Sequence, residues 1–283
     1  MAEICVVHLI RAQNGVEPFK RFIESYAKYR GGIDHDLVII FKGFTNREHI
    51  AEYRELLKSF SYKPLFVRDF GFDIRAYFSA VKAFDYKYYC FLNSYSYLLD
   101  QEWLKKLYTY ISKDGVGLVG ATGSYESRYT NYLNGQSANN NNHSYTQTVK
   151  KLQQWKKRIR RKYAFDSFPN YHIRTNGFMI SREVMNKIRR RFIFNKMDAC
   201  KFESGKNSLT KQVLKMDYKV LVVGKDGRAY EKEEWYKTDI FRMGNQQNLL
   251  IADNQTDMYA LADGEMKHEL TRQAWGNKVG MYD

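Results

Sequence analysis

Apolar runs and helix-like stripes alternate along the first 120 residues of the chain. Each short run is rich in β-branched and aromatic residues, and the segment after it repeats apolar residues every three or four positions. The pattern predicts strands at residues 3–10, 36–41, 64–68, 88–92 and 116–120, separated by helices at 16–26, 50–60, 74–81 and 103–111. Strands that are apolar at nearly every position are covered on both faces, so we expect an α/β fold with a mostly parallel sheet between helices.

The regular pattern breaks in the middle of the chain. Residues 131–148 are polar, rich in asparagine and without a period, which predicts a mobile loop. Residues 150–162 hold eight Lys or Arg among thirteen positions, and Leu152, Trp155 and Ile159 share one face if this segment is helical. We therefore expect a flexible loop followed by a basic amphipathic helix, outside the sheet.

Strand and helix signals resume after this segment. They predict a strand at 171–180, a helix beginning at Ser181, an acid-led helix at 203–216 and a strand at 218–224. We expect a single domain built from an α/β half, an insertion, and a second half with a mixed C-terminal extension, at residues 1–124, 125–167 and 168–283.

The carboxyl ends of the predicted strands mark the place for a site, because parallel sheets bind ligands beyond these ends. Four segments follow those ends, at residues 11–14, 42–43, 93–96 and 121–127. Each carries polar side chains directly after an apolar strand. We therefore expect the functional site along this edge of the sheet.

Composition narrows the class of protein. Aromatic residues are 16% and hydrophobic residues 44% of the 283 residues, which excludes global disorder. No apolar run reaches the roughly 18–20 residues of a membrane span, and the first residues lack the pattern of a signal peptide. The three cysteines form no CxxC pair, so we expect no disulfide framework or zinc ribbon, and a cytoplasmic location.

The net charge is strongly positive, at 46 − 31 = +15. Such a charge fits three kinds of partner: nucleic acid, a membrane surface or an anionic substrate. Nucleic-acid binding through residues 150–162 and 186–191 is one alternative, but none of the usual nucleic-acid-binding motifs accompanies these segments. The six histidines lack HExxH spacing, so we expect no catalytic zinc.

Four segments together resemble a known family. They are the opening strand–helix with Arg11, the stretch 73–84 leading to FLNSYS at 91–96, the strand GLVGATGSYES at 117–127, and HIRTNGFMIS at 172–181 followed by residues 202–224. In order and spacing they resemble nucleotide-sugar glycosyltransferases of the GT-A fold, in particular bacterial and viral enzymes of polysaccharide and surface-glycan synthesis, such as lipopolysaccharide or capsule. The likeness covers roughly 3–124 and 168–226.

The resemblance implies transfer of a hexose from a nucleotide sugar to a glycan or lipid-linked saccharide, with inversion the favoured outcome. It places the donor at residues 1–124 and the acceptor at 168–283, in an enzyme that is cytoplasmic or peripheral on the inner membrane. A nucleotidyltransferase of similar fold is an alternative, although RAQNG after the first strand matches its signature poorly. Nucleic acid is not an expected partner under this interpretation.

The family's metal-binding DxD motif is altered here. Asn93 and Tyr95 stand at the two acidic places, with Ser94 between them. Mg²⁺ and Mn²⁺ prefer charged oxygen ligands, so we expect no tightly bound cofactor at this turn. The alternative for residues 93–96 is a plain polar turn. If no metal binds, the resemblance implies that Arg and Lys side chains neutralise the diphosphate of the nucleotide sugar. The candidates are Arg11, Lys42, Arg75 and Arg174.

The acid-led helix carries the candidate general base. The resemblance places Glu203 at the family's first acid and Ser204 at the second, so Glu203 is the expected base and Asp198 the reserve. The alternative is that Glu203 lies in the first helical turn and only stabilises the helix dipole. The stereochemistry of transfer stays open, because a retaining enzyme does not need such a base.

The resemblance suggests further binding residues. Asp73 opens the helix where the family contacts base and ribose, with a helix N-cap as its alternative role. Candidates for the sugar and the acceptor are Thr122, Ser124, Glu126, His172, Arg174 and Thr175, with a tight turn and a structural histidine as the alternatives. Residues 245–256 either line the acceptor side or form surface loops.

The basic segment has an interpretation of its own. Its cations with Trp155 fit an interfacial helix on anionic lipid or an anionic acceptor, the alternative being a solvated basic surface. The residues of this patch are Lys150, Lys151, Trp155, Lys156, Lys157, Arg158, Arg160 and Arg161.

Overall fold

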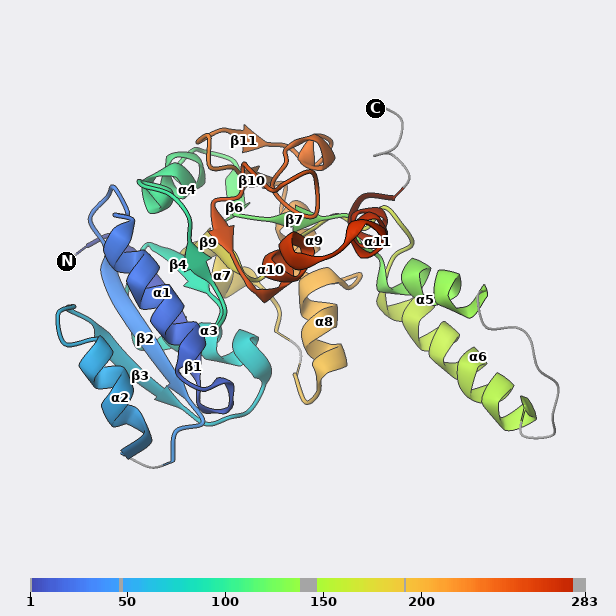
Figure 1. Ribbon diagram of the computed structural model, residues 1–283, viewed down its shortest axis with the longest axis horizontal. Helices are drawn as coiled ribbons and strands as arrows, with labels where there is room; N and C mark the ends of the chain where they lie inside the picture. The colour runs from blue at the N-terminus through green and yellow to red at the C-terminus, as the bar shows by residue number, and fades with distance from the viewer. Residues whose placement is uncertain (1, 46–47, 138–146, 191, 277–283) are drawn as a thin grey trace.

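A sheet of eight strands forms the centre of the computed structural model, which describes residues 2–45, 48–137, 147–190 and 192–276 (Figure 1). The strand order is β11-β10-β6-β9-β4-β1-β2-β3. The strands are β1 (Ile4–Arg11), β2 (Asp36–Lys42), β3 (Lys63–Val67), β4 (Tyr88–Leu92), β6 (Val116–Gly120), β9 (Gly177–Ser181), β10 (Lys219–Val223) and β11 (Ala229–Tyr230).

The described helices are α1 (Glu17–Lys28), α2 (Glu48–Leu56), α3 (Phe72–Ala83), α4 (Trp103–Ile111), α5 (Arg128–Ser137), α6 (Gln147–Ala164), α7 (Arg182–Lys187), α8 (Lys196–Ser204), α9 (Leu209–Leu214), α10 (Asn254–Leu261) and α11 (Gly264–Trp275). Two short strand pairs flank the sheet: β5 (Tyr97–Leu98) with β12 (Ile251–Ala252), and β7 (Gly123–Ser124) with β8 (His172–Ile173).

The sheet is mostly parallel, as the strand–helix alternation predicted. β1 pairs in parallel with β2 and β4, β2 with β3, and β10 with β6. Two strands are antiparallel to their neighbours: β11 at the edge of the sheet, beside β10, and β9, which lies between β4 and β6. Because of β9, the chain enters this part of the sheet from the opposite end, and the residues just before β9 reach the same edge as the carboxyl ends of its neighbours.

Two apolar layers cover the two faces of the sheet. Alternate residues of β1 point to opposite faces, so that Val6 and Ile10 pack with α1, α2 and α4, whereas Val7 and Leu9 pack with α3, α7 and α9. Burial on both faces explains why these strands read as continuous apolar runs in the sequence.

His8 is an uncharacteristic member of the strand core. Its side chain is fully buried and stacks on Phe22 with ring centroids 3.7 Å apart. Within the described part of the chain, neither ring nitrogen has a hydrogen-bond partner. Burial lowers the pKa of His8 to about 3, because the charged imidazolium would lose its hydration.

We expect His8 to make the fold sensitive to acid. Its pKa is below that of an unfolded histidine, so below about pH 6.5 the unfolded chain binds a proton that the native chain does not, and stability falls with pH. His8→Leu should therefore remove about 2 kcal/mol of the stability difference between pH 7.5 and pH 5, measured by urea unfolding. His268→Gln, at an exposed position, is the control; a pH dependence unchanged in His8→Leu would contradict the prediction.

The predicted insertion forms a helical hairpin that projects from the body of the molecule (Figure 1). The basic helix is confirmed as α6, but residues 131–137 belong to α5 and not to a loop. The remainder of the predicted loop, up to residue 146, lies outside the described residues. Among the described helices, none is both long and apolar enough to cross a bilayer.

Two predicted elements are divided in the structure. The helix expected at 203–216 is instead the end of α8 followed by α9, with residues 205–208 between the two helices. The Ser208 side chain caps α9 by accepting a hydrogen bond from the Lys211 amide at 3.4 Å. The strand expected at 171–180 becomes β8 and β9. Ser181 caps α7 as predicted, accepting from the Val184 amide at 3.1 Å.

Candidate active site

The carboxyl ends of β1, β2 and β3 meet in a charged cluster. Arg11, the last residue of β1, donates two hydrogen bonds of 3.0 Å to the two carboxylate oxygens of Asp69. Lys42, the last residue of β2, lies 3.2 Å from the same carboxylate. These bonds, with that to Arg11 the strongest, lower the pKa of Asp69. Asp69 is not among the predicted site residues, although it directly follows the third predicted strand.

The Lys42 side chain points into the protein. Its side chain is 1% exposed, and the ammonium donates to the Phe72 carbonyl at 2.9 Å in addition to pairing with Asp69. Burial lowers the pKa of Lys42, and Asp69 opposes that effect. The prediction of a phosphate contact is therefore corrected: Lys42 ties the β3–α3 loop to the end of β2.

Asp73 lies in the first turn of α3, beside this cluster. The N-cap of the helix is Gly71, with φ of 74°, and no side chain caps it, so the N-cap role considered for Asp73 is wrong. Burial raises the pKa of Asp73, Lys42 and Arg11 oppose the rise, and Glu203 adds to it. The charges of Asp73 and Glu203 are therefore close enough to interact across the edge.

Arg75 is two residues beyond Asp73 in the same turn, at an exposed position. Its guanidinium lies over the Phe70 ring, 4.8 Å from the centroid, and the side chain is exposed. Arg75 is thus a solvent-exposed cation on Phe70, the residue after Asp69. Its role as a contact to the nucleotide sugar stays a prediction.

The altered DxD segment is a closed turn after β4. The side-chain oxygen of Asn93 accepts from the Tyr95 amide at 2.8 Å and from the Ser96 hydroxyl at 3.0 Å, while Ser94 is buried. Tyr95 is 39% exposed. The hydrogen bonds from Arg11 to Asp69 are the main cause of the raised pKa of Arg11, and Tyr95 adds a smaller contribution. Since the Asn93 oxygen is engaged within the turn, Tyr95 is the member of this segment that faces outward.

Glu203 is held in a defined orientation at the end of α8. Its Oε1 accepts from the Thr175 amide at 2.8 Å and from the Thr175 hydroxyl at 2.9 Å. Within the described part of the chain, Oε2 has no hydrogen-bond partner. Glu203 is in the last turn of α8, which begins at Lys196, so the alternative of a first-turn carboxylate serving the helix dipole is wrong.

His172 lies behind Glu203 in the buried β8 strand. Its Nδ1–H donates to the Asn170 carbonyl at 2.8 Å, which leaves Nε2 as the acceptor of the neutral ring. Burial lowers the pKa of His172, and the charges of Glu203 and Glu126 work in the opposite direction. A buried, hydrogen-bonded ring is what we expect of a structural histidine, which was the alternative role considered for His172.

Arg174 is fixed by a buried ion pair. It donates to Asp253 at 2.8 Å and stacks over the Phe241 ring at 4.2 Å, with side-chain exposures of 12% for Arg174 and 2% for Asp253. Asp253 also caps α10, accepting from the Gln255 and Thr256 amides at 3.0 Å each. This contact joins the residues before β9 to the C-terminal part of the chain.

The predicted sugar contacts Thr122 and Ser124 turn inward. Thr122 is buried and donates to the Asn176 side chain, while Ser124 is buried and accepts from the Glu126 amide at 3.0 Å. Their hydroxyls hold the sheet edge together, so the prediction that they bind sugar is corrected. The Glu126 carboxylate is half-buried, accepts from Asn131 at 3.1 Å and lies 3.6 Å from Arg242.

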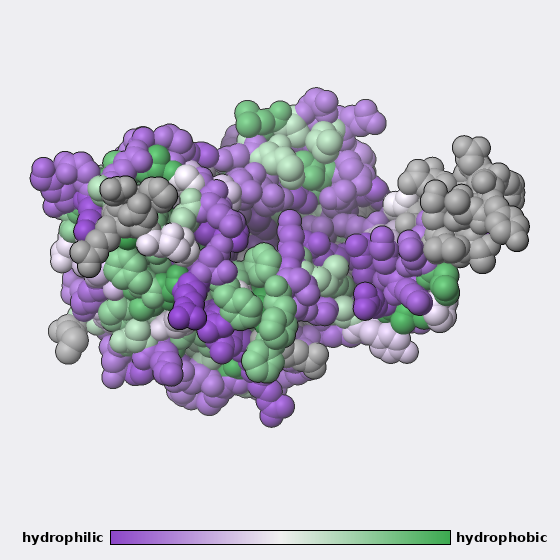
Figure 2. Space-filling view, turned by 90° about the horizontal axis from the view of Figure 1, so that it is seen from below, coloured by the Kyte–Doolittle hydropathy of each residue, from purple (hydrophilic) through white to green (hydrophobic). Residues whose placement is uncertain are grey.

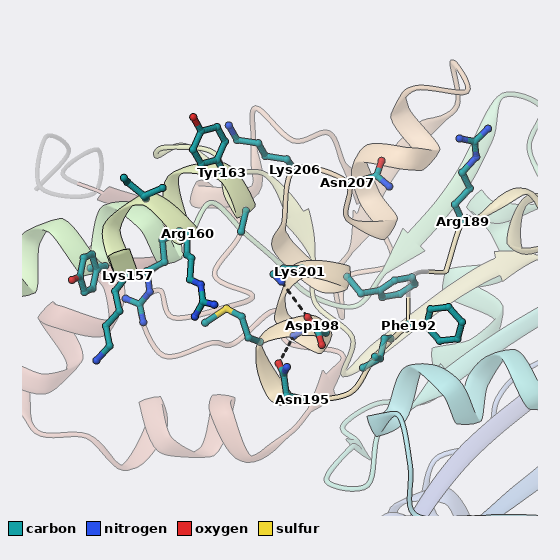
Figure 3. A pocket seen from close by; sticks show the side chains of 17 residues that line it. Lys157, Arg160, Tyr163, Arg189, Phe192, Asn195, Asp198, Lys201, Lys206 and Asn207 are labelled. Atoms are coloured by element: carbon teal, nitrogen blue, oxygen red, sulfur yellow. Dashed lines mark hydrogen bonds and ion pairs between the residues drawn. The ribbon is translucent and has the colours of Figure 1, made fainter. Parts of the chain in front are cut away.

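Asp198 lies on a different face of α8 from Glu203. Five residues correspond to about 140° around a helix, and Asp198 pairs with Lys201 at 3.1 Å and accepts from the Phe194 amide at 3.2 Å. It lines a cavity of about 1080 Å³ between α6 and α8 (Figure 3). The reserve role of Asp198 as base is therefore corrected: it belongs to the start of the helix and to this cavity.

The C-terminal segment is more deeply buried than a surface loop. Residues 249–253 are buried, so the alternative of polar surface loops is wrong for this part of 245–256. Arg242, also buried, donates to Gln255 at 3.0 Å beside Glu126. Asp253 could have been found from the sequence. It stands three positions before Thr256, and the two residues form a capping box at the start of α10.

Comparison with known proteins supports the fold assignment. A scan against protein-family models finds no match, and a search of curated proteins finds no similar sequence. Solved structures do match. The mannosyltransferase PcManGT from Pyrobaculum calidifontis, in complex with GDP-Man and Mn²⁺, has a TM-score of 0.50 and 9% identity, covering 84% of this chain and 60% of its own. This chain thus corresponds to less than two thirds of that protein.

Two further structures are similar at lower scores. TarS 1–349 from S. aureus covers 96% of this chain and 70% of its own, with a TM-score of 0.46 and 12% identity. Core-mannan synthase A from Aspergillus fumigatus, in an Mn/GDP form, covers 77% and 69%, with a TM-score of 0.41 and 8% identity. At such identities a structural likeness concerns the fold. The sheet order, the flanking helices and the match to PcManGT show that this chain has the GT-A fold of nucleotide-sugar glycosyltransferases.

Proposed function

We propose that the protein is a glycosyltransferase that moves a sugar from a nucleotide-sugar donor to a hydroxyl of a saccharide acceptor. One observation carries the proposal: in a GT-A fold, Glu203 is oriented through Oε1 by Thr175, and its charge interacts with Asp73 at the edge where Arg11 also lies. A carboxylate with one oxygen fixed and the other without a partner has the form of a general base.

The geometry suggests how the step proceeds. The acceptor hydroxyl attacks the anomeric carbon and gives its proton to Oε2 of Glu203. The bond between the anomeric carbon and the donor phosphate breaks, and the nucleoside diphosphate leaves with the electron pair. Arg11 and Arg75 lie near the N-terminus of α3 and counter the charge that develops on the leaving diphosphate. Attack from the face opposite the diphosphate makes this an inverting transfer.

A divalent cation does not fit the Asn93–Ser96 turn. The Asn93 oxygen already accepts two hydrogen bonds within the turn, and a phenol such as Tyr95 is a poor ligand for Mg²⁺ or Mn²⁺. Among the described residues, no three His, Cys, Asp or Glu side chains gather in a metal-binding group. The proposed transfer therefore relies on the arginines of the chain for its positive charge.

Binding and turnover with a panel of UDP-, GDP- and dTDP-sugars test the proposal. At least one nucleotide sugar should raise the melting temperature, and DNA and RNA should not. Arg11→Gln should weaken donor binding about tenfold because it removes a charged hydrogen-bond donor, whereas Arg54→Gln, at an exposed position on α2, should leave it unchanged. Turnover is expected both in EDTA and with added Mn²⁺. Binding of nucleic acid without any nucleotide sugar would contradict the proposal.

A further inference from the structure

A stripe of exposed apolar side chains lies on the side of α6 that does not pack on α5, and its Tyr163 lines the cavity between α6 and α8. Leu152, Trp155 and Tyr163 are 50%, 58% and 78% exposed. They recur at helical spacing on one side of α6. The opposite side packs on α5, where Arg161 lies over the Tyr132 ring at 4.4 Å. The stripe is therefore an unpartnered face of the projecting hairpin.

A second exposed apolar group lies in the loops before α3 and α8. Phe192 is 82%, Phe194 67% and Phe70 41% exposed. The Phe194 ring contacts both others, with centroids 5.8 Å from Phe192 and 5.9 Å from Phe70. Single exposed apolar residues are ordinary on a protein surface, but a cluster of three aromatic rings marks an interaction surface.

Cations lie between the two groups. The cavity between α6 and α8 has Lys157 and Arg160 on one side and Arg189 with Phe192 on the other (Figure 3). Lys157, Arg160 and Arg189 form no ion pair with another described residue, and Asp198 is the one acidic residue of the lining. Trp155, Phe192 and these cations thus combine aromatic rings with uncompensated positive charge.

Figure 2 views the molecule from below. Hydrophobic residues gather at the centre and on the left of this face, and a smaller hydrophobic area lies on the right beside hydrophilic residues (Figure 2). We call this surface the basic–aromatic face and define it by Phe70, Leu152, Trp155, Lys157, Arg160, Tyr163, Arg189, Phe192 and Phe194.

We propose that the basic–aromatic face docks on an anionic lipid bilayer. Aromatic and aliphatic side chains are stable at the boundary between lipid headgroups and acyl chains, and Lys and Arg beside them attract anionic headgroups. A soluble polyanion would satisfy the cations but would leave Trp155, Phe192 and Phe194 in water. The bilayer is therefore the partner that accounts for both kinds of residue.

Docking in this way brings the candidate site to the membrane surface. Phe70 directly follows Asp69 of the Arg11 cluster, and α8 carries Asp198 at the cavity and Glu203 at the site. This inference goes beyond the proposed function and does not depend on it. If both hold, the acceptor is a saccharide linked to a membrane lipid.

Co-sedimentation of the full chain with vesicles tests the proposal, without any nucleotide sugar present. The protein should bind phosphatidylcholine vesicles that contain phosphatidylglycerol, and not pure phosphatidylcholine, and high salt should release it. Lys157→Glu combined with Arg160→Glu should lower partitioning about a hundredfold. Phe192→Ser combined with Phe194→Ser should lower it about tenfold with no change in net charge.

The matched control is Lys113→Glu combined with Lys225→Glu. These exposed lysines follow α4 and β10, at the top of Figure 1, and their replacement changes the net charge by the same amount. The control should bind vesicles like the unaltered protein. Loss of binding in the control, or full binding by the Phe192/Phe194 variant, would overturn the proposal, because either result would mean that net charge alone drives adsorption. Melting temperatures of all variants verify that they fold.

Discussion

Replacement of Glu203 by Gln is expected to lower the rate of sugar transfer by about 10²–10⁴, with donor binding retained. The Gln side chain has the same shape, and its oxygen can still accept from the Thr175 amide and hydroxyl, so the local structure is preserved. What is lost is the capacity to take the proton of the acceptor hydroxyl. Turnover at saturating donor, together with donor binding by calorimetry, measures the two effects separately.

Asp198→Asn is the matched control for this variant. It removes the same charge from the same helix, but on the face that lines the cavity between α6 and α8. Its turnover should stay within about twofold of the unaltered enzyme, because Asp198 has no part in the proposed proton transfer. Full activity of Glu203→Gln would remove Glu203 as the base. Equal losses in the two variants would indicate a general effect of charge on α8.

Asp253→Asn is expected to destabilise the fold by about 3 kcal/mol, because it leaves the guanidinium of Arg174 without its buried counter-charge. Asparagine caps a helix as well as aspartate does, so the bonds to the Gln255 and Thr256 amides are kept. Asp253→Ala removes these as well and should cost about 1 kcal/mol more. Urea unfolding at neutral pH measures both differences.

Asp263→Asn is the control that distinguishes loss of the Arg174–Asp253 ion pair from a change at a helix cap. Asp263 caps α11 by accepting from the Met266 amide at 2.8 Å, but it is exposed and forms no ion pair with a described residue. This variant should unfold at the same urea concentration as the unaltered protein. If Asp253→Asn behaved in the same way, the pair with Arg174 would contribute nothing to stability, and the joining of the C-terminal segment to β9 would need another explanation.

The first half of the fold was predictable because its pattern is local. β4 and β6 have the predicted bounds, β2 is one residue longer than predicted, and β1 and β3 are each shifted by one residue. A strand that is buried on both faces is apolar at nearly every position, whereas a helix packed on a sheet is apolar at every third or fourth position. The two kinds of element can therefore be told apart from the sequence. The antiparallel insertion of β9 was not predictable, since an apolar run does not reveal the direction in which it pairs.

The location of the site stays a prediction from the strand ends, and the contacts within it were harder to predict. In the structure the charges of Arg11 and Glu203 both act on the pKa of Asp73, which burial raises. Lys42 and Thr122 follow strand ends in the same way, yet both side chains are buried. Whether a polar residue at such an edge faces solvent depends on its neighbours in space. Lys42 is buried because Asp69 and the Phe72 carbonyl, distant in sequence, satisfy its ammonium.

The sequence by itself determined the α/β class and the basic helix, and it indicated the edge at which we propose the site, because each depends on residues within one turn or one strand. The tertiary structure decided which polar side chains at this edge are exposed and which are buried in contacts within the protein. Glu203 lies at the end of α8 and accepts a hydrogen bond from Thr175, whereas Asp198 lies on another face of the same helix. Arg174 pairs with Asp253, which is 79 residues away in the sequence. Such contacts depend on the packing of distant segments, and hydrogen bonds between them leave no periodic trace in the chain.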